Sequence, residues 1–292
     1  MTVSNIAHAW RSLLYVPGNN ERFLSKAQSR GADALILDLE DSVPDDRKSE
    51  ARKMVSDAIE PLAKGPSALV VRINGGVRAA VADLEKVVRP GLSAVMISKC
   101  ETPEKPAVIG EILSDLEAER GLPLGKIALI ALVETPGGLA DASRIAHSDS
   151  RLAAMLLGSE DFATACRMDP SQDTLKLAKQ SIIYAARSAG LAPLGLLDTV
   201  ANFSEADLVG LVERSKQFGF SGSTCVHPRV VNALNDGFQP SVEEIREAQR
   251  IVAAMAEANK KGRGAASLDG RMIDAPLLKR AQDTLAQVSN AS

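Results

Sequence analysis

The sequence predicts an α/β protein, a TIM (β/α)8 barrel followed by a C-terminal helical extension. Short apolar segments alternate with helical segments through eight units without a break, which calls for a parallel sheet covered by helices. This count favours closure into a barrel over an open sheet. The open alternative, a dinucleotide-binding fold, also lacks its fingerprint, because no GxGxxG follows the first strand.

Each expected strand is a short aliphatic run that stops at a polar residue, a glycine or a proline. The strands are expected at Ser12–Val16, Ala34–Leu39, Ala68–Ile73, Ala94–Ser98, Ile127–Val133, Ala153–Leu157, Leu194–Thr199 and Gly222–Val226. The helices of the barrel are expected at Glu21–Arg30, Asp46–Glu60, Arg78–Val88, Pro103–Arg120, Pro136–Ile145, Gln172–Ala189 and Ser204–Phe218. Asn19 or Asn20 is expected to cap the first of these helices.

The expected domains are a catalytic barrel over residues 1–240 and a helical extension over residues 241–292. The extension contains a helix at Val242–Lys261, a glycine-rich link and a final helix at Ala275–Val288. It is too apolar to be a loose tail, as shown by Met272, Ile273, Leu277 and Leu278. We expect it to pack on the barrel or on a neighbouring subunit, and glycines in the link would let it move as a lid.

Composition excludes several classes of protein. The chain of 292 residues has 34 basic and 37 acidic side chains, a net charge of −3 and no long basic run, which argues against a nucleic-acid partner. Its 3 cysteines lack CxxC spacing, so neither a disulfide framework nor a cysteine zinc site is expected. No signal peptide or membrane-spanning segment is evident, and the expected location is the cytoplasm, away from membranes.

Polar residues follow the apolar strands, and in a TIM barrel the active site is built at these carboxyl ends. In strand order from the second strand to the eighth, the residues are Glu40 and Asp41, Arg72 and Asn74, Lys99, Glu134, Asp161, Asp198 and His227. His227 has two interpretations, a general base or a hydrogen-bonded cap before Pro228.

Glu134 and Asp161 follow neighbouring strands and can converge on one ion. Two carboxylates with water ligands suit Mg²⁺, and Mn²⁺ is also possible. The alternative for Glu134 is a surface carboxylate stabilised by the next helix N-terminus. Arg72 stands in an apolar strand, where it would either grip a substrate carboxylate or pair with the acids after the second strand. Glu40 and Asp41 would then orient metal-bound waters or balance Arg72.

Seven motifs give the chain a resemblance to the citrate lyase beta-subunit family of the HpcH/HpaI aldolase group. Each motif is weak alone, but together they occur in order at the predicted strand ends and in the tail. They are RSLLYVPG at 11–18, LDLEDSV at 37–43, VRIN at 71–74, VETPGG at 133–138, GSEDF at 158–162, VHP at 226–228 and GRMIDAPLLKRAQ at 270–282.

The resemblance implies a Mg²⁺-dependent carbon–carbon lyase, or the reverse condensation, acting on a 3-hydroxyacyl thioester such as malyl-CoA, citramalyl-CoA or a citryl thioester. The products would be an acyl-CoA and an α-keto acid. Glu134 and Asp161 match the metal ligands, with Glu134 also facing substrate. Arg72 matches the arginine that binds the keto-acid carboxylate.

Asp274 matches the family's catalytic acid or base, carried by a tail that reaches an adjacent subunit, so the resemblance also implies a homo-oligomer, a trimer or hexamer. Arg22 and Lys26 are the candidates for the CoA phosphates. Two other readings stay open: a pyruvate-forming class II aldolase on free hydroxy-keto acids, and a citrate lyase beta subunit working in a complex on an acyl-carrier-protein thioester.

The chain departs from the family pattern at two places beside the predicted site. Ser98 precedes Lys99 where relatives commonly have proline, and Cys166, Arg167 and Met168 follow GSEDF where many relatives continue toward a Leu-Gly pair. Because that second loop borders the predicted metal, the choice of substrate is the property most affected.

Overall fold

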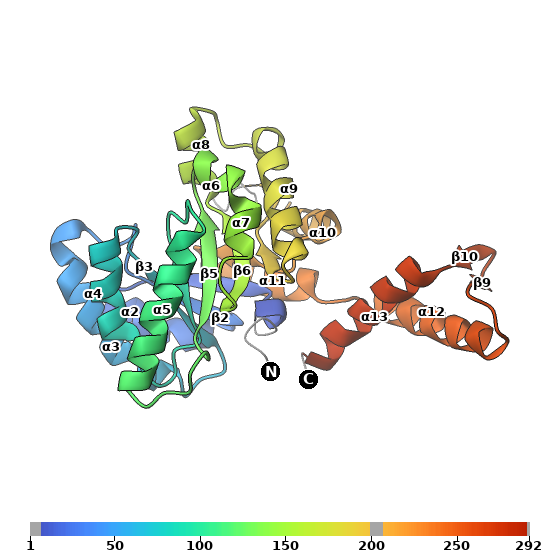
Figure 1. Ribbon diagram of the computed structural model, residues 1–292, viewed down its shortest axis with the longest axis horizontal. Coiled ribbons are helices and arrows are strands. Elements are labelled where there is room, and N and C mark those ends of the chain that lie inside the picture. The colour runs from blue at the N-terminus through green and yellow to red at the C-terminus, as the bar shows by residue number, and fades with distance from the viewer. Residues whose placement is uncertain (1–6, 199–206, 291–292) are drawn as a thin grey trace. The chain divides into compact units, whose positions relative to one another are not determined.

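The computed structural model describes residues 7–198 and 207–290 (Figure 1). The chain divides into two compact units, Met1–Phe238 and Gln239–Ser292. Each unit has its own hydrophobic core, and each is described by itself. Among the described residues, none of the helices combines the length and hydropathy that a bilayer crossing requires.

The first unit is a barrel of parallel strands, which confirms the predicted class. The strands are β1 Ser12–Pro17, β2 Ala34–Asp38, β3 Ala68–Ile73, β4 Ala94–Ile97, β5 Ala128–Val133, β6 Leu152–Leu157, β7 Ala192–Leu194 and β8 Ser223–Cys225. Their spatial order is β7-β6-β5-β4-β3-β2-β1-β8, and a parallel bridge between Leu194 and Gly222 joins the two ends.

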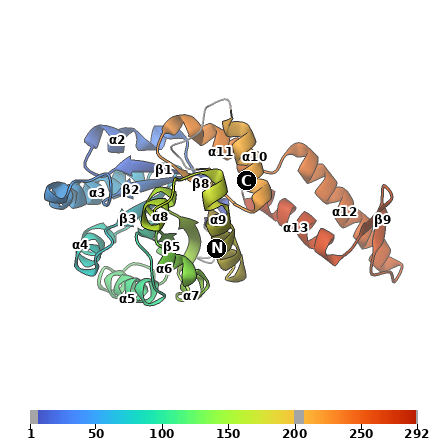
Figure 2. The same ribbon diagram turned by 90° about the horizontal axis from the view of Figure 1, so that it is seen from above.

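Helices lie outside the strands, as the view from above shows (Figure 2). They are α2 Glu21–Lys26, α3 Lys48–Leu62, α4 Val77–Val87, α5 Glu104–Glu119, α6 Pro136–Ala140, α7 Ala142–Ala146, α8 Ser159–Cys166, α9 Gln172–Ser188, α10 Leu208–Phe218 and α11 Val231–Phe238. Short 3-10 turns are η1 Ala7–Ala9, η2 Ala27–Arg30, η3 Asp45–Arg47 and η4 Pro228–Val230. Asn20 caps α2 by accepting a hydrogen bond from the Phe23 N–H.

The strands alternate between two apolar layers, because successive side chains of a strand point to opposite faces. In β2, Ala34 and Ile36 belong to the barrel interior together with Trp10. Leu35 and Leu37 belong instead to the layer between the strands and the helices. The same alternation turns Asp38 at the end of β2, Arg72 near the end of β3 and Glu134 just after β5 inward, toward the mouth of the barrel.

Parts of the first unit differ from the sequence prediction. Strand β7 ends at Leu194, well before the predicted Thr199, which lies outside the described residues, as does the predicted helix start at Ser204. The strand stops because Gly195 has φ 152°, far from extended backbone. The helix predicted up to Ile145 breaks at Asp141 into α6 and α7, and the short helices α8 and α11 were not anticipated.

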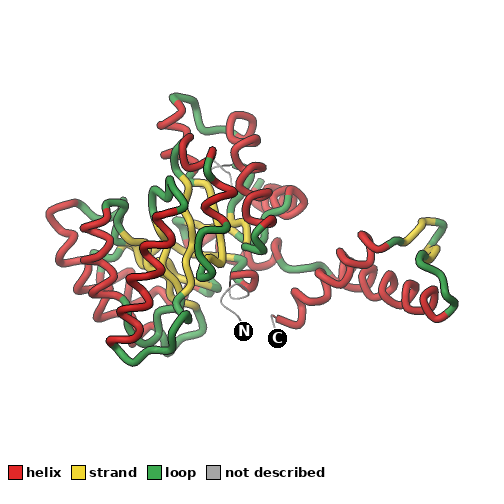
Figure 3. The backbone as a smooth tube through the Cα atoms, viewed as in Figure 1, coloured by secondary structure: helices red, strands yellow, loops and turns green. Residues whose placement is uncertain are grey.

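The second unit contains α12 Val242–Lys260, β9 Ala266–Leu268, β10 Arg271–Ile273 and α13 Ala275–Asn290, all visible in Figure 3. The predicted glycine-rich link is wrong in part, because it forms an antiparallel hairpin of β9 and β10. Its turn uses Asp269 at φ 48° and Gly270 at φ 76°, the two positive values that a tight hairpin turn requires. Ile273 is buried in the core of this unit, whereas Met272 is exposed.

Candidate metal and substrate site

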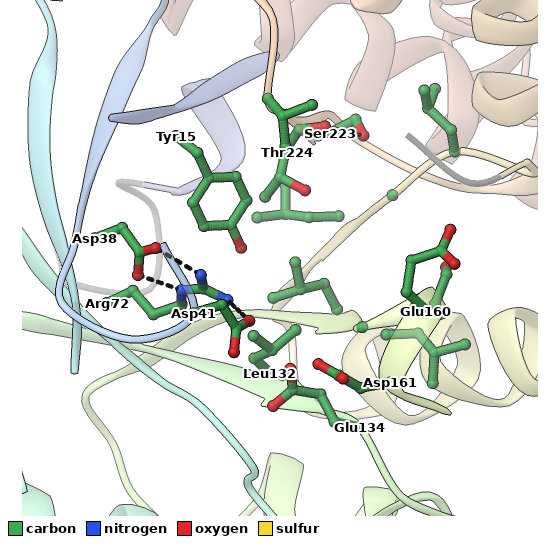
Figure 4. Close-up of a pocket in the computed structure, with 18 of the residues that line it drawn as sticks. Tyr15, Asp38, Asp41, Arg72, Leu132, Glu134, Glu160, Asp161, Ser223 and Thr224 are labelled. Atoms are coloured by element: carbon green, nitrogen blue, oxygen red, sulfur yellow. Dashed lines mark hydrogen bonds and ion pairs between the residues drawn. The ribbon is translucent and has the colours of Figure 1, made fainter. Parts of the chain in front are cut away.

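A cavity of about 450 Å³ opens at the carboxyl ends of the strands in the first unit. Its lining combines charged side chains from β2, β3, α8, α9 and the residues that follow β2, β5 and β7 with apolar ones from β5, β6 and β7. Figure 4 shows Arg72 between Asp38 and Asp41, with Glu134 and Asp161 facing each other beside them. The structure therefore brings together the residues predicted at the ends of the second, third, fifth and sixth strands.

Arg72 is held by carboxylates on two sides. It lies directly across from Asp38 in the β2–β3 register, and its Nε and Nη2 donate to the two Asp38 oxygens over 2.6 and 2.7 Å. Its Nη1 donates to Asp41 over 2.8 Å. The guanidinium stacks 4.8 Å from the centre of the Tyr15 ring. Both roles predicted for Arg72 are thus compatible with its position: it pairs with the acids after β2 and lines the cavity.

Burial would raise the pKa of Asp38, but the hydrogen bonds and the charge of Arg72 outweigh that effect and lower it. The fork between the two side chains is therefore an ion pair at neutral pH. Asp38 was not among the predicted site residues, although its position at the inward end of an alternating strand is a signal that would have identified it.

Glu40 is buried beside this ion pair and joins it to Lys99. One Glu40 oxygen accepts from Lys99 Nζ over 3.0 Å, and the other lies 3.3 Å from Arg72 Nη1. Burial, and then the neighbouring Asp41, raise the pKa of Glu40. Glu40 lines a second hollow and not the main cavity. Its position therefore favours a role in holding Arg72 over direct contact with substrate.

Glu134 is 2 % exposed and follows β5 directly. Burial raises its pKa to about 8, and the nearby Asp161 carboxylate adds to that effect. The main-chain N–H of Lys99 opposes it by donating to Glu134 over 2.6 Å. Lys99 makes this contact from φ 50°, a conformation that non-glycine residues rarely adopt. A buried carboxylate that resists ionisation is a favourable place for a cation.

The residues fit a divalent metal ion. Asp41, Glu134 and Asp161 each offer a carboxylate oxygen, and these oxygens lie within 4.8 Å of one another. Hard cations such as Mg²⁺ take this kind of oxygen ligand and keep other positions for water or substrate. Asp41 enters the cluster although the sequence suggested only a balancing or orienting role for it. Asp161 comes from the first turn of α8 and not from a strand end.

Three other predicted residues of the first unit, Arg22, Lys26 and His227, do not line the cavity. Arg22 and Lys26 are exposed on α2 and do not line the cavity, so a role with CoA stays a prediction. Asp274 belongs to the second unit, where its carboxylate accepts from the Leu277 N–H at the start of α13. His227 is the cap that one interpretation predicted, because its Nδ1 accepts from the Arg229 N–H over 3.1 Å.

Lys179 of α9 also lines the cavity, and sequence inspection missed it. It is 2 % exposed, and its ammonium donates to the carbonyls of Leu197 and Asp198, each over 2.9 Å. Burial lowers its pKa to about 8. The sequence offers no signal for this residue, because lysines are common in amphipathic helices such as α9 and usually face solvent.

The family of the chain follows from comparison with known proteins. Residues 11–228 match the HpcH/HpaI aldolase/citrate lyase family. The chain belongs to that family. It is 33% identical over 285 residues to citrate lyase subunit beta of Leuconostoc mesenteroides subsp. cremoris, covering 97% of this chain and 94% of that protein. It is 35% identical over 286 residues to (3S)-malyl-CoA thioesterase of Cereibacter sphaeroides, covering 96% and 95%.

A human relative, mitochondrial citramalyl-CoA lyase, is 32% identical over 292 residues, covering 94% of this chain and 84% of that protein. Among solved structures, CitE from Mycobacterium tuberculosis in complex with magnesium, acetoacetate and coenzyme A has a TM-score of 0.73 at 29% identity, covering 95% of this chain and 97% of that one. The predicted resemblance, the barrel and the assignment to a lyase family are confirmed.

Proposed function

We propose that the protein is a Mg²⁺-dependent lyase that cleaves a 3-hydroxyacyl-CoA, such as malyl-CoA or citramalyl-CoA, into an acyl-CoA and an α-keto acid. The observation that carries the proposal is the convergence of Asp41, Glu134 and Asp161 beside Arg72 in one cavity. The names of the relatives support the substrate class, and the magnesium and coenzyme A bound by a similar structure support the cofactor.

Asp41, Glu134 and Asp161 would hold the ion. When bound, Mg²⁺ supplies Lewis-acid polarisation of the oxygen that becomes the keto group. Arg72 supplies a guanidinium for the substrate carboxylate, and Asp38 fixes its plane through the bidentate contact. The Tyr15 ring stacks on one face of the guanidinium.

Cleavage requires the hydroxyl proton to pass to water at the open mouth of the cavity and the bond between C2 and C3 to break. The electron pair of that bond passes into the thioester, giving an enolate that takes up one proton at C2 to become the acyl-CoA. Asp274 is the proposed donor of that proton, supplied by the second unit of an adjacent subunit in a homotrimer or hexamer. A lost acid or base of this kind typically slows a reaction by about 10²- to 10⁴-fold.

The decisive experiment incubates the purified protein with Mg²⁺ and malyl-CoA or citramalyl-CoA and follows the keto acid and the CoA products separately. We expect keto acid and acyl-CoA in equal amounts, with turnover abolished in Asp161→Asn. Absence of keto acid from both substrates would overturn the proposal.

Thioester hydrolysis is the second candidate activity, because one relative is named a malyl-CoA thioesterase. It is distinguished in the same assay by free CoA and a hydroxy acid, formed without any keto acid. Activity only on a thioester of an acyl-carrier protein would instead place the chain in a citrate-lyase-like complex.

A further inference from the structure

Two hydroxyl groups of the cavity lining, those of Tyr15 in β1 and Thr224 in β8, lack good hydrogen-bond partners. We call them the floor hydroxyls. Among the described residues, the partner of the Tyr15 hydroxyl is Met96 Sδ at 3.4 Å, and a thioether is a weak acceptor. The Thr224 hydroxyl has no partner in the described part of the chain, although Thr224 is only 8% exposed. Because buried polar groups nearly always have a partner, such a pair indicates a polar ligand.

The barrel brings the floor hydroxyls to one side of the cavity. Strands β1 and β8 are neighbours, and Leu13 is the register partner of Thr224. Tyr15 lies two residues beyond Leu13 and therefore points to the same face of β1, where its ring packs against the core of the barrel interior. Figure 4 shows Tyr15 and Thr224 across the cavity from Glu134 and Asp161. The cavity thus has an acidic side and a side that carries neutral hydroxyls.

Arg72 lies beside the Tyr15 ring, with the guanidinium carbon 4.8 Å from the ring centre. Three of its five N–H hydrogens already go to Asp38 and Asp41, and a Glu40 oxygen lies 3.3 Å from Nη1. A carboxylate accepts about four hydrogen bonds, so the hydrogens that Arg72 has left cannot satisfy a bound carboxylate alone. Further donors next to the guanidinium would complete its coordination.

The floor hydroxyls are suited to donate to an anion. Burial raises the pKa of Tyr15 above its ordinary value, so the phenol keeps its proton at neutral pH. A hydroxyl forms a short, strong hydrogen bond with a carboxylate. Such a bond would replace the weak contact of Tyr15 with Met96 and give Thr224 the partner that it lacks. Little existing bonding is therefore lost when an anion binds.

Depth decides which end of the substrate reaches the floor hydroxyls. In the β1–β2 register Tyr15 pairs with Ile36, two residues before the level of Asp38 and Arg72, so it lies deeper in the barrel. Coenzyme A is too large for a cavity of about 450 Å³, so the thioester has to leave through the open mouth. The small anionic end of the substrate is then the part that reaches Tyr15 and Thr224.

We infer that the Tyr15 and Thr224 hydroxyls bind the substrate carboxylate together with Arg72, each donating one hydrogen bond to it. The same carboxylate remains in the keto acid after cleavage, so the floor hydroxyls also hold that product. This inference rests on the proposed function, because it completes the substrate site of the same cavity.

The test measures pyruvate binding by calorimetry with Mg²⁺ present. Tyr15→Phe and Thr224→Val each remove one hydroxyl and keep the shape of the side chain. Each should weaken pyruvate binding by about tenfold or more, the scale of a lost hydrogen bond to a charged group. Binding of Mg²⁺ without pyruvate should stay unchanged. The matched control is Tyr184→Phe, which removes the same group from the exposed face of α9 and should leave pyruvate binding unchanged.

Stability separates ligand binding from a structural role. Without ligand, Thr224→Val replaces an unpartnered hydroxyl by a methyl group, so the unfolding temperature should stay the same or rise. Tyr15→Phe loses only the weak contact with Met96 and should change stability little. Pyruvate with Mg²⁺ should then stabilise the parent more than either variant. A clear loss of stability in both ligand-free variants would show a structural role and overturn the inference.

Steady-state kinetics with citramalyl-CoA identify the group that the floor hydroxyls bind. The charge of the substrate carboxylate does not change during cleavage, so in both variants KM should rise about tenfold while kcat stays within about twofold. A fall in kcat at unchanged KM would place the hydroxyls at a reacting oxygen and overturn the inference.

The binding outcomes separate this inference from the lyase function. Unchanged pyruvate affinity in either variant, or no binding of pyruvate to the parent, overturns the inference, and cleavage of a thioester by the parent would still leave the lyase function standing. Weaker pyruvate binding in both variants of a protein that cleaves neither thioester overturns the proposed function and leaves the carboxylate assignment standing.

Discussion

The two ends of the barrel use the same residue types to opposite effect. At the amino end, Arg151 and Glu117 form a closed pair: Glu117 accepts from both terminal nitrogens of Arg151 and from the Gly125 and Ile127 N–H groups. At the carboxyl end, Arg72 faces Asp38, Glu40 and Asp41, and Lys99 pairs with Glu40, while Glu134 and Asp161 lie close by. One end balances its buried charge, and the other carries an excess of carboxylate.

The pKa values of two buried glutamates express this difference. Burial would raise the pKa of Glu117, but the hydrogen bonds from Arg151, Ile127 and Gly125 outweigh it and lower the pKa. Burial dominates for Glu134, whose pKa rises to about 8. In a TIM barrel the amino end serves stability and the carboxyl end serves chemistry. An unmatched buried carboxylate is the physical signature of the second role.

Of the variants that test this difference between the two ends, Glu134→Gln should have the largest effect on activity. The variant keeps the shape of the side chain but removes a metal ligand, so kcat/KM with Mg²⁺ should fall by about 10³-fold or more, the scale of lost metal and electrostatic catalysis. Steady-state kinetics with malyl-CoA or citramalyl-CoA measure it. A loss of kcat/KM of less than tenfold would contradict the assignment of Glu134 as a metal ligand at the carboxyl end.

The amino end should respond in the opposite way. Glu117→Gln leaves Arg151 buried without its counter-charge, and removal of one partner of such a pair typically costs about 3–5 kcal/mol of unfolding free energy. Chemical denaturation measures that loss, and kcat/KM of the folded variant should stay within about twofold of the parent. Loss of activity without loss of stability would contradict the division of roles.

The pH dependence of stability gives a further contrast. Because the pKa of Glu134 is raised, its protonated form favours the native state, and this contribution is lost as pH rises toward about 8. In metal-free protein, Glu134→Gln should therefore gain stability relative to the parent between about pH 5 and 8, by up to about 1.4 kcal/mol per pH unit.

Glu117 has the opposite sign, since its pKa is lowered. Its contribution is present above the unfolded pKa and is lost as pH falls into the acid range. The gap between the parent and Glu117→Gln should narrow on acidification. Urea midpoints of both variants across pH measure the two trends, and parallel trends would refute the comparison.

The smallest effect is expected for the pair between Arg11 and Asp33, which lies before β1 and β2 at the amino end. The contact is bidentate but partly exposed, with 27% and 18% side-chain exposure. Solvent screens such a pair, so Arg11→Met should cost about 1 kcal/mol and leave kinetics unchanged. Thermal unfolding together with kcat/KM tests both statements, and altered kinetics would connect the amino end to the site.

Much of the fold was predictable because the apolar runs of the strands are short and clearly bounded. The range predicted for β3, Ala68–Ile73, agrees with the structure residue for residue. The region of β7 was not predictable in this way, because LAPLGLL is apolar on both sides of Gly195. The strand ends where Gly195 takes a positive φ next to the Phe220 ring, and this contact comes from a distant part of the chain.

The acidic cluster was predictable in its members but not in its geometry. Glu134 and Arg72 are visible in the sequence as polar endings of apolar strands. The position of Asp161 on α8 and the entry of Asp41 depend on loops, whose path no periodicity encodes. Lys179 depends on a contact with carbonyls 18 and 19 residues away in the chain, which only the packed structure reveals.

Because its pKa is raised to about 8, Glu134 should stay largely protonated at pH 7 until a divalent ion binds between it and Asp161. Calorimetry of Mg²⁺ binding at pH 7, in buffers of different ionisation enthalpy, measures the number of protons released. The account predicts one bound ion with release of close to one proton, and neither signal in Glu134→Gln. Binding of Mg²⁺ to Glu134→Gln with the affinity of the parent, or binding without proton release, would contradict it.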